Sequence, residues 1–469
     1  MSFWQLDHAQ AETPALLLGC DGATERRVSY LRLAQMADDI MAALGKPERK
    51  RLGVIRCRNA EAPVAAYLGA LRAGDCVMLL GDQLSPVLWS AILDAYKPDW
   101  VFGPESDQIV SGVQDYLVRA APDGWQMLER QPASVGSASD IHPDVAVLLS
   151  TSGTTGSPKM VRLSYQNLDA NARSIVDYLR ITSDSRAITT LPFHYSYGMS
   201  VINSQLQAGA SLVLTESSLL SREFWDTFQQ HRVTSMSGVP YTFQMLHRLD
   251  PRKLALDSLQ TLTQAGGHLA PRWVTYFRDL AEERHWQFFV MYGQTEASPR
   301  ISYVPPERLA QKLGSIGVAI PGGKLCLSED DELIYEGPNV MLGYASCRED
   351  LAKGDDMHGR LPTGDLARMD DEGFVFLTGR KKRFVKINGN RISLDDIEQH
   401  LEQKLSAPVA VTGDDLRIKV FLTDSSGLDQ TKQVMTDVYR LHHTAFAVGT
   451  IEVLPMHSSG KKDYGSLPA

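Results

Sequence analysis

A segment rich in glycine and hydroxyl side chains, Leu149–Lys159 (LSTSGTTGSPK), has the residue types that bind phosphate groups. Glycines expose backbone N–H donors, hydroxyls add further donors, and a lysine supplies positive charge, so an oligophosphate is the ligand that suits it. A flexible surface loop is the alternative, but an apolar run precedes the segment and a capped helix follows it. The candidate phosphate-binding residues are Thr151, Ser152, Gly153, Thr154, Thr155, Gly156 and Lys159.

The nucleotide-binding loop of the Walker A type does not fit this chain. That motif needs Ser or Thr after a Gly-Lys pair, whereas the pairs at Gly45, Gly323 and Gly460 are followed by Pro, Leu and Lys. A nucleotide would therefore be bound by a different fold.

Two carboxylates follow glycine-containing turns further along the chain. Tyr292 and Glu296 (YGQTE) come after the apolar run Phe288–Met291, and open α/β sheets bind ligands at the carboxyl ends of their strands. A hard cation between phosphate oxygens needs a carboxylate such as Glu296, whose alternative role is a solvated loop acid. Asp365 follows a glycine, and an Asp in that position is commonly a turn former.

Five motifs, in order, resemble those of the adenylate-forming superfamily, which includes acyl- and aryl-CoA synthetases, adenylation domains of peptide synthetases and beetle luciferases. The segment TSGTTGSPK resembles the phosphate loop of that family. The other four motifs are VMYGQTEAS (290–298), LPTGDLA (361–367), GRKKRFVKINGNRI (379–392) and PMHSSGKKD (455–463).

The resemblance implies roles for residues that would bind the nucleotide. Tyr292 would line the adenine pocket, Thr295 would contact the α-phosphate and Glu296 would hold Mg²⁺. Asp365 would accept both ribose hydroxyls, and Arg380 would also reach the ribose.

The resemblance also implies an acyl pocket. Gly266 and Gly267, in QAGGH (264–268), would pack along the adenine, with Gly267 on one wall of the acyl pocket; an ordinary strand-to-helix turn is the alternative. His194 and Tyr195 would line that pocket, unless these aromatic residues, with Tyr197, belong to the core. Because no Asp lies between residues 186 and 216, a free α-amino acid is disfavoured, and we expect an aryl or otherwise uncharged acyl group.

The C-terminal motifs imply a catalytic lysine and a hinge. Lys461 resembles the lysine that offsets the negative charge formed when a carboxylate attacks the α-phosphate, with a solvated tail as the alternative. We expect Lys462 to be solvated. Lys382 stands at the hinge position. A basic cluster around it is either a solvated face or a patch for CoA phosphates or an acidic carrier protein; its members are Lys381, Lys382, Arg383, Lys386 and Arg391.

Strand-like apolar runs alternate with helical periodicity over about the first 370 residues, which predicts an α/β fold with largely parallel sheets. We expect a large multi-sheet domain over residues 1–380 and a small mobile α+β domain over 381–469. Expected strands include 144–150, 187–191, 211–214, 233–239, 373–377, 416–422 and 450–453. Ser164, Ser221 and Ser393 are expected to cap helices.

Composition excludes several classes of protein. The 469 residues include 47 Lys and Arg against 56 Asp and Glu, a net charge of -9 that disfavours binding to nucleic acid or anionic membranes. The N-terminus has no signal-peptide pattern, and no apolar run approaches about eighteen residues. Five cysteines, none two residues apart, indicate neither a disulfide framework nor a zinc site. We expect a soluble, cytoplasmic protein.

The activity that the resemblance implies uses ATP and Mg²⁺ to convert a carboxylic acid to acyl-AMP and pyrophosphate. The acyl group would then pass to a thiol supplied in trans, either CoA or the phosphopantetheine arm of a carrier protein. Two other classes stay open at this point: a non-catalytic nucleotide-binding sensor and a luciferase-like monooxygenase.

Overall fold

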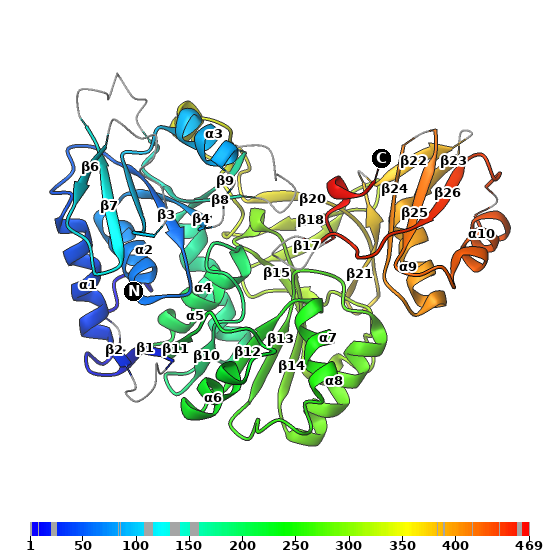
Figure 1. Cartoon of the computed structure of the whole chain (residues 1–469), viewed down its shortest axis with the longest axis horizontal. Coiled ribbons are helices and arrows are strands. Elements are labelled where there is room, and N and C mark those ends of the chain that lie inside the picture. The colour runs from blue at the N-terminus through cyan, green and yellow to red at the C-terminus, as the bar shows by residue number, and fades with distance from the viewer. Residues whose placement is uncertain are drawn as a thin grey trace. The chain divides into compact units, whose positions relative to one another are not determined.

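The computed structural model divides into two compact units (Figure 1). The N-terminal unit comprises Met1–Lys324 and Glu336–Leu361, and the C-terminal unit comprises Leu325–Tyr335 and Pro362–Ala469. Residues 362–380 therefore group with the C-terminal unit and not with the larger one, in contrast to the expected boundary at 380. The structure describes residues 2–7, 9–19, 26–82, 84, 86–106, 116–131, 141–150, 159–381, 383–387, 390–414, 416–439, 441–456 and 462–468.

The first large sheet of the N-terminal unit has eight described strands in the order β19-β9-β8-β4-β3-β5-β7-β6. Its central strands β5, β3, β4 and β8 are parallel, and the outer strands are antiparallel. The strands are β3 (Leu52–Cys57), β4 (Cys76–Gly81), β5 (Trp100–Pro104), β6 (Tyr116–Arg119), β7 (Trp125–Arg130), β8 (Val145–Ser150), β9 (Met160–Ser164) and β19 (Gly343–Ala345).

The second large sheet has nine described strands in the order β16-β15-β14-β13-β12-β10-β11-β1-β2. All the pairs from β1 to β14 are parallel, and the edges β2, β15 and β16 are antiparallel. The strands are β1 (Pro14–Leu18), β2 (Arg26–Ser29), β10 (Arg186–Ile188), β11 (Ser211–Leu214), β12 (Ser235–Gly238), β13 (Thr261–Gln264), β14 (Gln287–Gly293), β15 (Arg300–Val304) and β16 (Val318–Ala319).

Four helices pack between these two sheets. Helices α2 (Glu61–Ala73) and α4 (Tyr165–Leu179) contact the eight-stranded sheet, α1 (Tyr30–Ala42) and α5 (Ser196–Gln207) contact the nine-stranded sheet, and α1 packs on α2 as α4 packs on α5. Figure 1 shows α7 (Pro240–Leu249) and α8 (Pro271–Arg284) side by side against β12 and β14. The remaining helices of this unit are α3 (Pro86–Tyr96) and α6 (Arg222–Gln230).

The described part of the C-terminal unit contains three small sheets. One has the order β17-β18-β20-β21, the second pairs β22 with β23, and the third has the order β24-β25-β26. Helices α9 and α10 pack on β24 and β26 around buried apolar residues such as Ile397, Leu401, Val420 and Met435. The elements are β17 (Lys324–Leu327), β18 (Glu332–Glu336), β20 (Arg360–Met369), β21 (Val375–Arg380), β22 (Phe384–Ile387), β23 (Asn390–Ser393), α9 (Leu394–Leu405), β24 (Val409–Gly413), β25 (Ile418–Leu422), α10 (Leu428–Asp437) and β26 (Phe446–Thr450).

The α/β fold class is confirmed, and most predicted elements are present. Ser164 caps α4, because its Oγ accepts from the N–H of Asn167 at 3.0 Å, and Ser221 caps α6 in the same way. The strand predicted over 450–453 is wrong. The ladder with β25 instead uses Phe446–Thr450, and the Val453 side chain is 75% exposed.

Candidate functional site

Most of the predicted site residues that the structure describes lie at the carboxyl ends of strands of the nine-stranded sheet. Strands β10, β12, β13 and β14 are neighbours and parallel, so their carboxyl ends face the same way. His194 and Tyr195 follow β10, Gly266 and Gly267 follow β13, and the Tyr292–Glu296 motif ends β14. At this edge, Ser196 Oγ and Thr295 Oγ1 are hydrogen-bonded at 3.1 Å.

Glu296 and Lys159, predicted separately for metal and phosphate, meet at one tyrosine. The hydroxyl of Tyr344 donates to Glu296 Oε1 at 3.0 Å, and Lys159 Nζ lies 3.7 Å from the centroid of the Tyr344 ring. Burial and the neighbouring Glu296 carboxylate raise the pKa of Tyr344, so its hydroxyl stays protonated and able to donate. The site thus has a lysine and a carboxylate held apart by a neutral aromatic side chain.

Tyr344 was not singled out in the sequence because it lies in the short strand β19 outside every motif. Its position depends on Arg162 of β9, whose side chain is fully buried and forms an ion pair with Asp356 at 2.6 Å. The Arg162 guanidinium also donates to the carbonyl oxygens of Leu342 and Tyr344, both at 3.2 Å. Next to this strand, the Met341 N–H donates to the Glu296 carbonyl at 2.8 Å. Tyr344 is thereby fixed beside Glu296.

Tyr195 and His194, which are predicted to line the acyl pocket, lie close to glycines that leave room for their side chains. Gly266 has a φ of +80°, and a Cβ there would lie 2.7 Å from Tyr195 Oη, which only a glycine permits. A Cβ at Gly81 would lie 3.0 Å from the His194 ring, and one at Gly267 would lie 3.1 Å from Pro240. Tyr195 and Gly266 are therefore direct neighbours, and their role in an acyl pocket stays a prediction.

The histidine and tyrosines of this region differ in how they are held. His194 is half-buried, its Nδ1 has no hydrogen-bond partner among the described residues, and burial lowers its pKa, so the ring is neutral at pH 7. Tyr197 is fully buried and its hydroxyl is hydrogen-bonded to Thr263 at 2.8 Å, as in the alternative that assigned it to the core. Tyr292 is half-buried, and its hydroxyl accepts from Gln294 Nε2 at 3.1 Å.

In the C-terminal unit, Asp365 and Arg380 are opposite one another on β20 and β21. Their Oδ1 and Nε atoms are 3.0 Å apart, and Asp365 is buried whereas the Arg380 side chain is 59% exposed. Inside β20, Gly364 precedes Asp365 with a φ of +74°, and the Thr363 hydroxyl accepts from the Asp365 N–H at 3.1 Å. The Asp365 carboxylate is thus held by an arginine, and ribose binding by this pair stays a prediction.

The basic cluster near residue 382 is partly neutralised inside the C-terminal unit. Lys381 Nζ lies 3.0 Å from Glu332 Oε2. Arg383 lies 2.8 Å from Asp395 and 3.4 Å from Glu398, with its side chain only 17% exposed. Arg383 is therefore committed to internal carboxylates and not to a surface patch for CoA or a carrier protein.

The prediction that Lys462 is solvated is wrong. Its Nζ lies 2.7 Å from Glu398 and 2.6 Å from Glu402, both on α9, and it donates to the Val409 carbonyl at 2.6 Å. Tyr464, where the resembling motif often has a basic residue, donates to Glu398 at 2.7 Å. Met456 and Lys462 form an isolated antiparallel bridge. This network anchors the residue next to the predicted catalytic lysine.

Several predicted residues lie outside the described part of the chain. They are Thr151, Ser152, Gly153, Thr154, Thr155, Gly156, Lys382 and Lys461. Their roles in phosphate binding, hinge motion and catalysis stay predictions.

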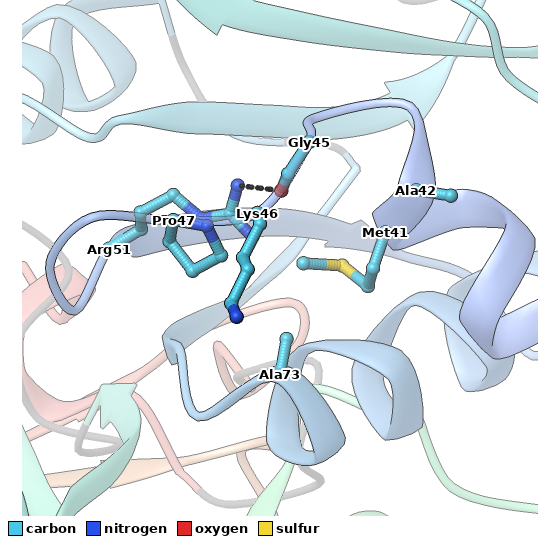
Figure 2. Close-up of a pocket in the computed structure, with 7 residues that line it drawn as sticks. All are labelled: Met41, Ala42, Gly45, Lys46, Pro47, Arg51 and Ala73. Atoms are coloured by element: carbon cyan, nitrogen blue, oxygen red, sulfur yellow. Dashed lines mark hydrogen bonds between the residues drawn. The ribbon is translucent and has the colours of Figure 1, made fainter.

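A surface pocket of about 650 Å³ lies apart from these residues, beside the carboxyl ends of α1 and α2 (Figure 2). It is lined by Met41, Ala42, Gly45, Lys46, Pro47, Arg51 and Ala73. Its arginine is already paired, with Nε 2.9 Å from Asp75 and Nη1 donating to the Gly45 carbonyl. The pocket contributes nothing to the predicted site.

Among the described residues, no cluster of three or more His, Cys, Asp and Glu side chains could hold a metal ion by itself. No helix in the same part of the chain is long and apolar enough to cross a membrane.

Comparisons with known proteins agree with the geometry. Residues 3–345 match the family model of the AMP-binding enzyme. The chain is 30% identical to indoleacetate–CoA ligase of Aromatoleum aromaticum, over 83% of this chain and 81% of that protein, and 31% identical to feruloyl-CoA synthase of an Amycolatopsis species, over 72% and 70%. O-succinylbenzoate coenzyme A synthetase of Bacillus subtilis, solved with AMP, superimposes with a TM-score of 0.76 at 23% identity, covering 100% of this chain and 98% of that one.

Proposed function

The chain belongs to the AMP-binding enzyme family, and from this membership we propose that it is an acid–thiol ligase that forms acyl-AMP and then a CoA thioester. In the first step a carboxylate oxygen attacks the α-phosphorus of ATP, and the bond to the β-phosphate oxygen breaks to release pyrophosphate. In the second step the thiol sulfur attacks the acyl carbon, AMP leaves, and the thiol proton passes to solvent.

The observation that carries this proposal is the arrangement of Lys159, Tyr344 and Glu296. The ammonium and the carboxylate are both half-buried, and among the described residues neither has an ion-pair partner of opposite charge. Their contacts are a ring face and a hydroxyl, which leave the charges available for phosphate oxygens and a cation.

The donor set fits Mg²⁺, which is commonly bound by one or two carboxylates together with substrate phosphates and water. Glu296 would hold it, and the Tyr344 hydroxyl would keep the carboxylate oriented. When bound, the ion would neutralise charge on the phosphate oxygens. The Lys159 ammonium would supply a second positive charge to the same oligophosphate.

CoA is the thiol that we favour over a carrier protein. The named relatives are CoA ligases, and the internal pairing of Arg383 removes one cation from the patch that could have met an acidic carrier surface. We propose an acid with an aryl group for two reasons. The Tyr195 and His194 rings follow β10, where the acyl pocket is predicted, and the relatives act on indoleacetate and ferulate. A cytoplasmic location stays a prediction.

Pyrophosphate release with a panel of aryl and alkyl carboxylic acids, with and without CoA, tests this function. We expect acid-dependent release, and a thioester only when CoA is present. Nucleotide binding without release for any acid would indicate the sensor, and light emission with a luciferin would indicate the monooxygenase.

A further inference from the structure

Arg300 is a buried arginine next to the candidate site. It begins β15 and pairs with Gly293 of β14, so it lies at the same sheet end as the Tyr292–Glu296 motif. The two backbones approach so closely that a Cβ at Gly293 would lie 1.7 Å from the Pro299 carbonyl oxygen. Only 3% of Arg300 is exposed.

Arg300 differs from two other buried arginines, Arg162 and Arg348, in having no carboxylate beside it among the described residues. Arg162 pairs with Asp356 at 2.6 Å, and Arg348, which is also 3% exposed, pairs with Asp99 at 2.7 Å. Among the described residues no carboxylate lies within 4.0 Å of the Arg300 guanidinium, and its Nε has no hydrogen-bond partner. Its guanidinium lies over the ring of Tyr197, with Cζ 4.1 Å from the ring centroid, and it also has the hydroxyl of Tyr178 as a hydrogen-bonding neighbour. A buried cation without a counter-ion is costly unless an anion arrives to bind it.

The charge of Arg300 acts on the acyl side of the site. Burial raises the pKa of Tyr195 to about 12, and the positive charge of Arg300 opposes that rise. Burial also raises the pKa of Tyr197, and Arg300 again opposes it. Tyr195 is the neighbour of Gly266 in the predicted acyl pocket. The Arg300 guanidinium therefore lies near the tyrosines that would surround the acyl group and not near the solvent.

We propose that Arg300 is a specificity-determining residue that binds a second carboxylate of the substrate, at the end of the acyl group remote from the carboxylate that is adenylated. The proposal rests on the proposed ligase function. A planar guanidinium suits a carboxylate because it can donate two parallel hydrogen bonds. The sequence predicted an uncharged acyl group, and the proposal changes that prediction. The absence of Asp over residues 186–216 argues against an ammonium group on the substrate, but it does not argue against a second carboxylate.

Matched pairs of acids test the proposal by kcat/KM for pyrophosphate release. Each pair contains a monocarboxylic aryl acid, such as 3-phenylpropanoate, and the same acid with a carboxylate on the far side of the ring. We expect the wild type to prefer the dicarboxylate at least about tenfold in one or more pairs, Arg300→Met to lose that preference, and Arg300→Lys to keep part of it. An unchanged preference in Arg300→Met, or a wild type that favours the monocarboxylate in every pair, would overturn the proposal.

Thermal unfolding gives a readout that does not depend on turnover, with Arg348→Met as the matched control. Arg348→Met leaves the Asp99 carboxylate with one cation fewer, so the Tm of this variant should fall. Arg300→Met removes a charge that has no carboxylate partner, so the Tm of that variant should stay the same or rise. Dicarboxylates should raise the wild-type Tm more than their monocarboxylate partners, and this difference should vanish in Arg300→Met. A Tm loss in Arg300→Met as large as in Arg348→Met would make Arg300 structural and overturn the proposal. If the wild type releases no pyrophosphate with any acid, the ligase function fails, and the Tm difference still decides whether Arg300 binds the second carboxylate.

Discussion

Two charged regions of the molecule use their charges in opposite ways. In the N-terminal unit, Lys159 and Glu296 contact the ring and the hydroxyl of Tyr344 and have no opposite charge beside them among the described residues. In the C-terminal unit, Lys462 is surrounded by Glu398, Glu402 and a carbonyl oxygen. Charges that are paired internally hold the fold together, whereas charges with neutral partners are available to a ligand.

The adjacent residues Lys461 and Lys462 give the sharpest form of this comparison. Lys461→Ala should reduce adenylation by roughly 10² to 10³, about 3 to 4 kcal/mol, as loss of a transition-state charge donor does. Thioester formation from supplied acyl-AMP should survive, because the resembling enzymes rotate this lysine away before that step. Separate assays of the two half-reactions measure this, and an equal loss in both would remove Lys461 from its catalytic role.

Asp365→Ala examines a charge that is paired and yet expected to bind a ligand. ATP binding should weaken, because each charge-assisted hydrogen bond to a ribose hydroxyl contributes about 1.5 to 3 kcal/mol. The KM for ATP should therefore rise by roughly 10-fold to 100-fold for each bond lost, at an unchanged Mg²⁺ requirement. If the KM does not change, the Asp365–Arg380 pair belongs to the fold alone.

Lys462→Met should affect stability more than catalysis. The three contacts of its ammonium lie in a region where the side chain is only 20% exposed, so their loss should lower the free energy of unfolding by about 2 kcal/mol. Urea unfolding measures the change, with Lys404→Met, at the end of the same helix α9, as a control for loss of a cation. Adenylation that falls as far as in Lys461→Ala, in a variant that remains folded, would contradict the separation of the two lysines.

Tyr344→Phe should have the smallest effect. It keeps the ring under Lys159 and removes one hydrogen bond to Glu296, which contributes about 1 kcal/mol. The Mg²⁺ concentration for half-maximal adenylation should rise about fivefold, with little change in Tm. Tyr344→Leu, which also removes the ring, should weaken ATP binding further. Phe and Leu variants with the same kinetics would show that the contact with Lys159 has no role.

The sequence predicted those parts of the site that are encoded within one short segment. Ser164 caps its helix, Glu296 lies in the 3-10 turn Thr295–Ala297 just after β14, and both positions follow from residues within a few positions of each other. Tyr344 could not be predicted, because it meets Glu296 only after β19 pairs with β9, whose Arg162 lies about 180 residues earlier.

Two other residues escaped prediction for the same reason. Lys462 looked like a solvated tail because its partners Glu398 and Glu402 lie 64 and 60 residues away. Arg300 follows the Glu296 motif directly, but an arginine at the start of a strand gives no sign in the sequence that it will be buried without a carboxylate. Whether a charged residue finds a partner far away in the sequence is decided only in the folded molecule.

The Arg162 contacts also imply an order of assembly during synthesis. Arg162 and the strand β9 emerge early, yet the carbonyls and the carboxylate that satisfy this cation belong to residues 342–356. Until that segment leaves the ribosome, β9 is an unpaired sheet edge and its arginine has no counter-ion. A nascent chain that ends before residue 342 would carry Lys159 and Glu296 but not the tyrosine between them. We expect its nucleotide affinity to appear only when β19 has been added.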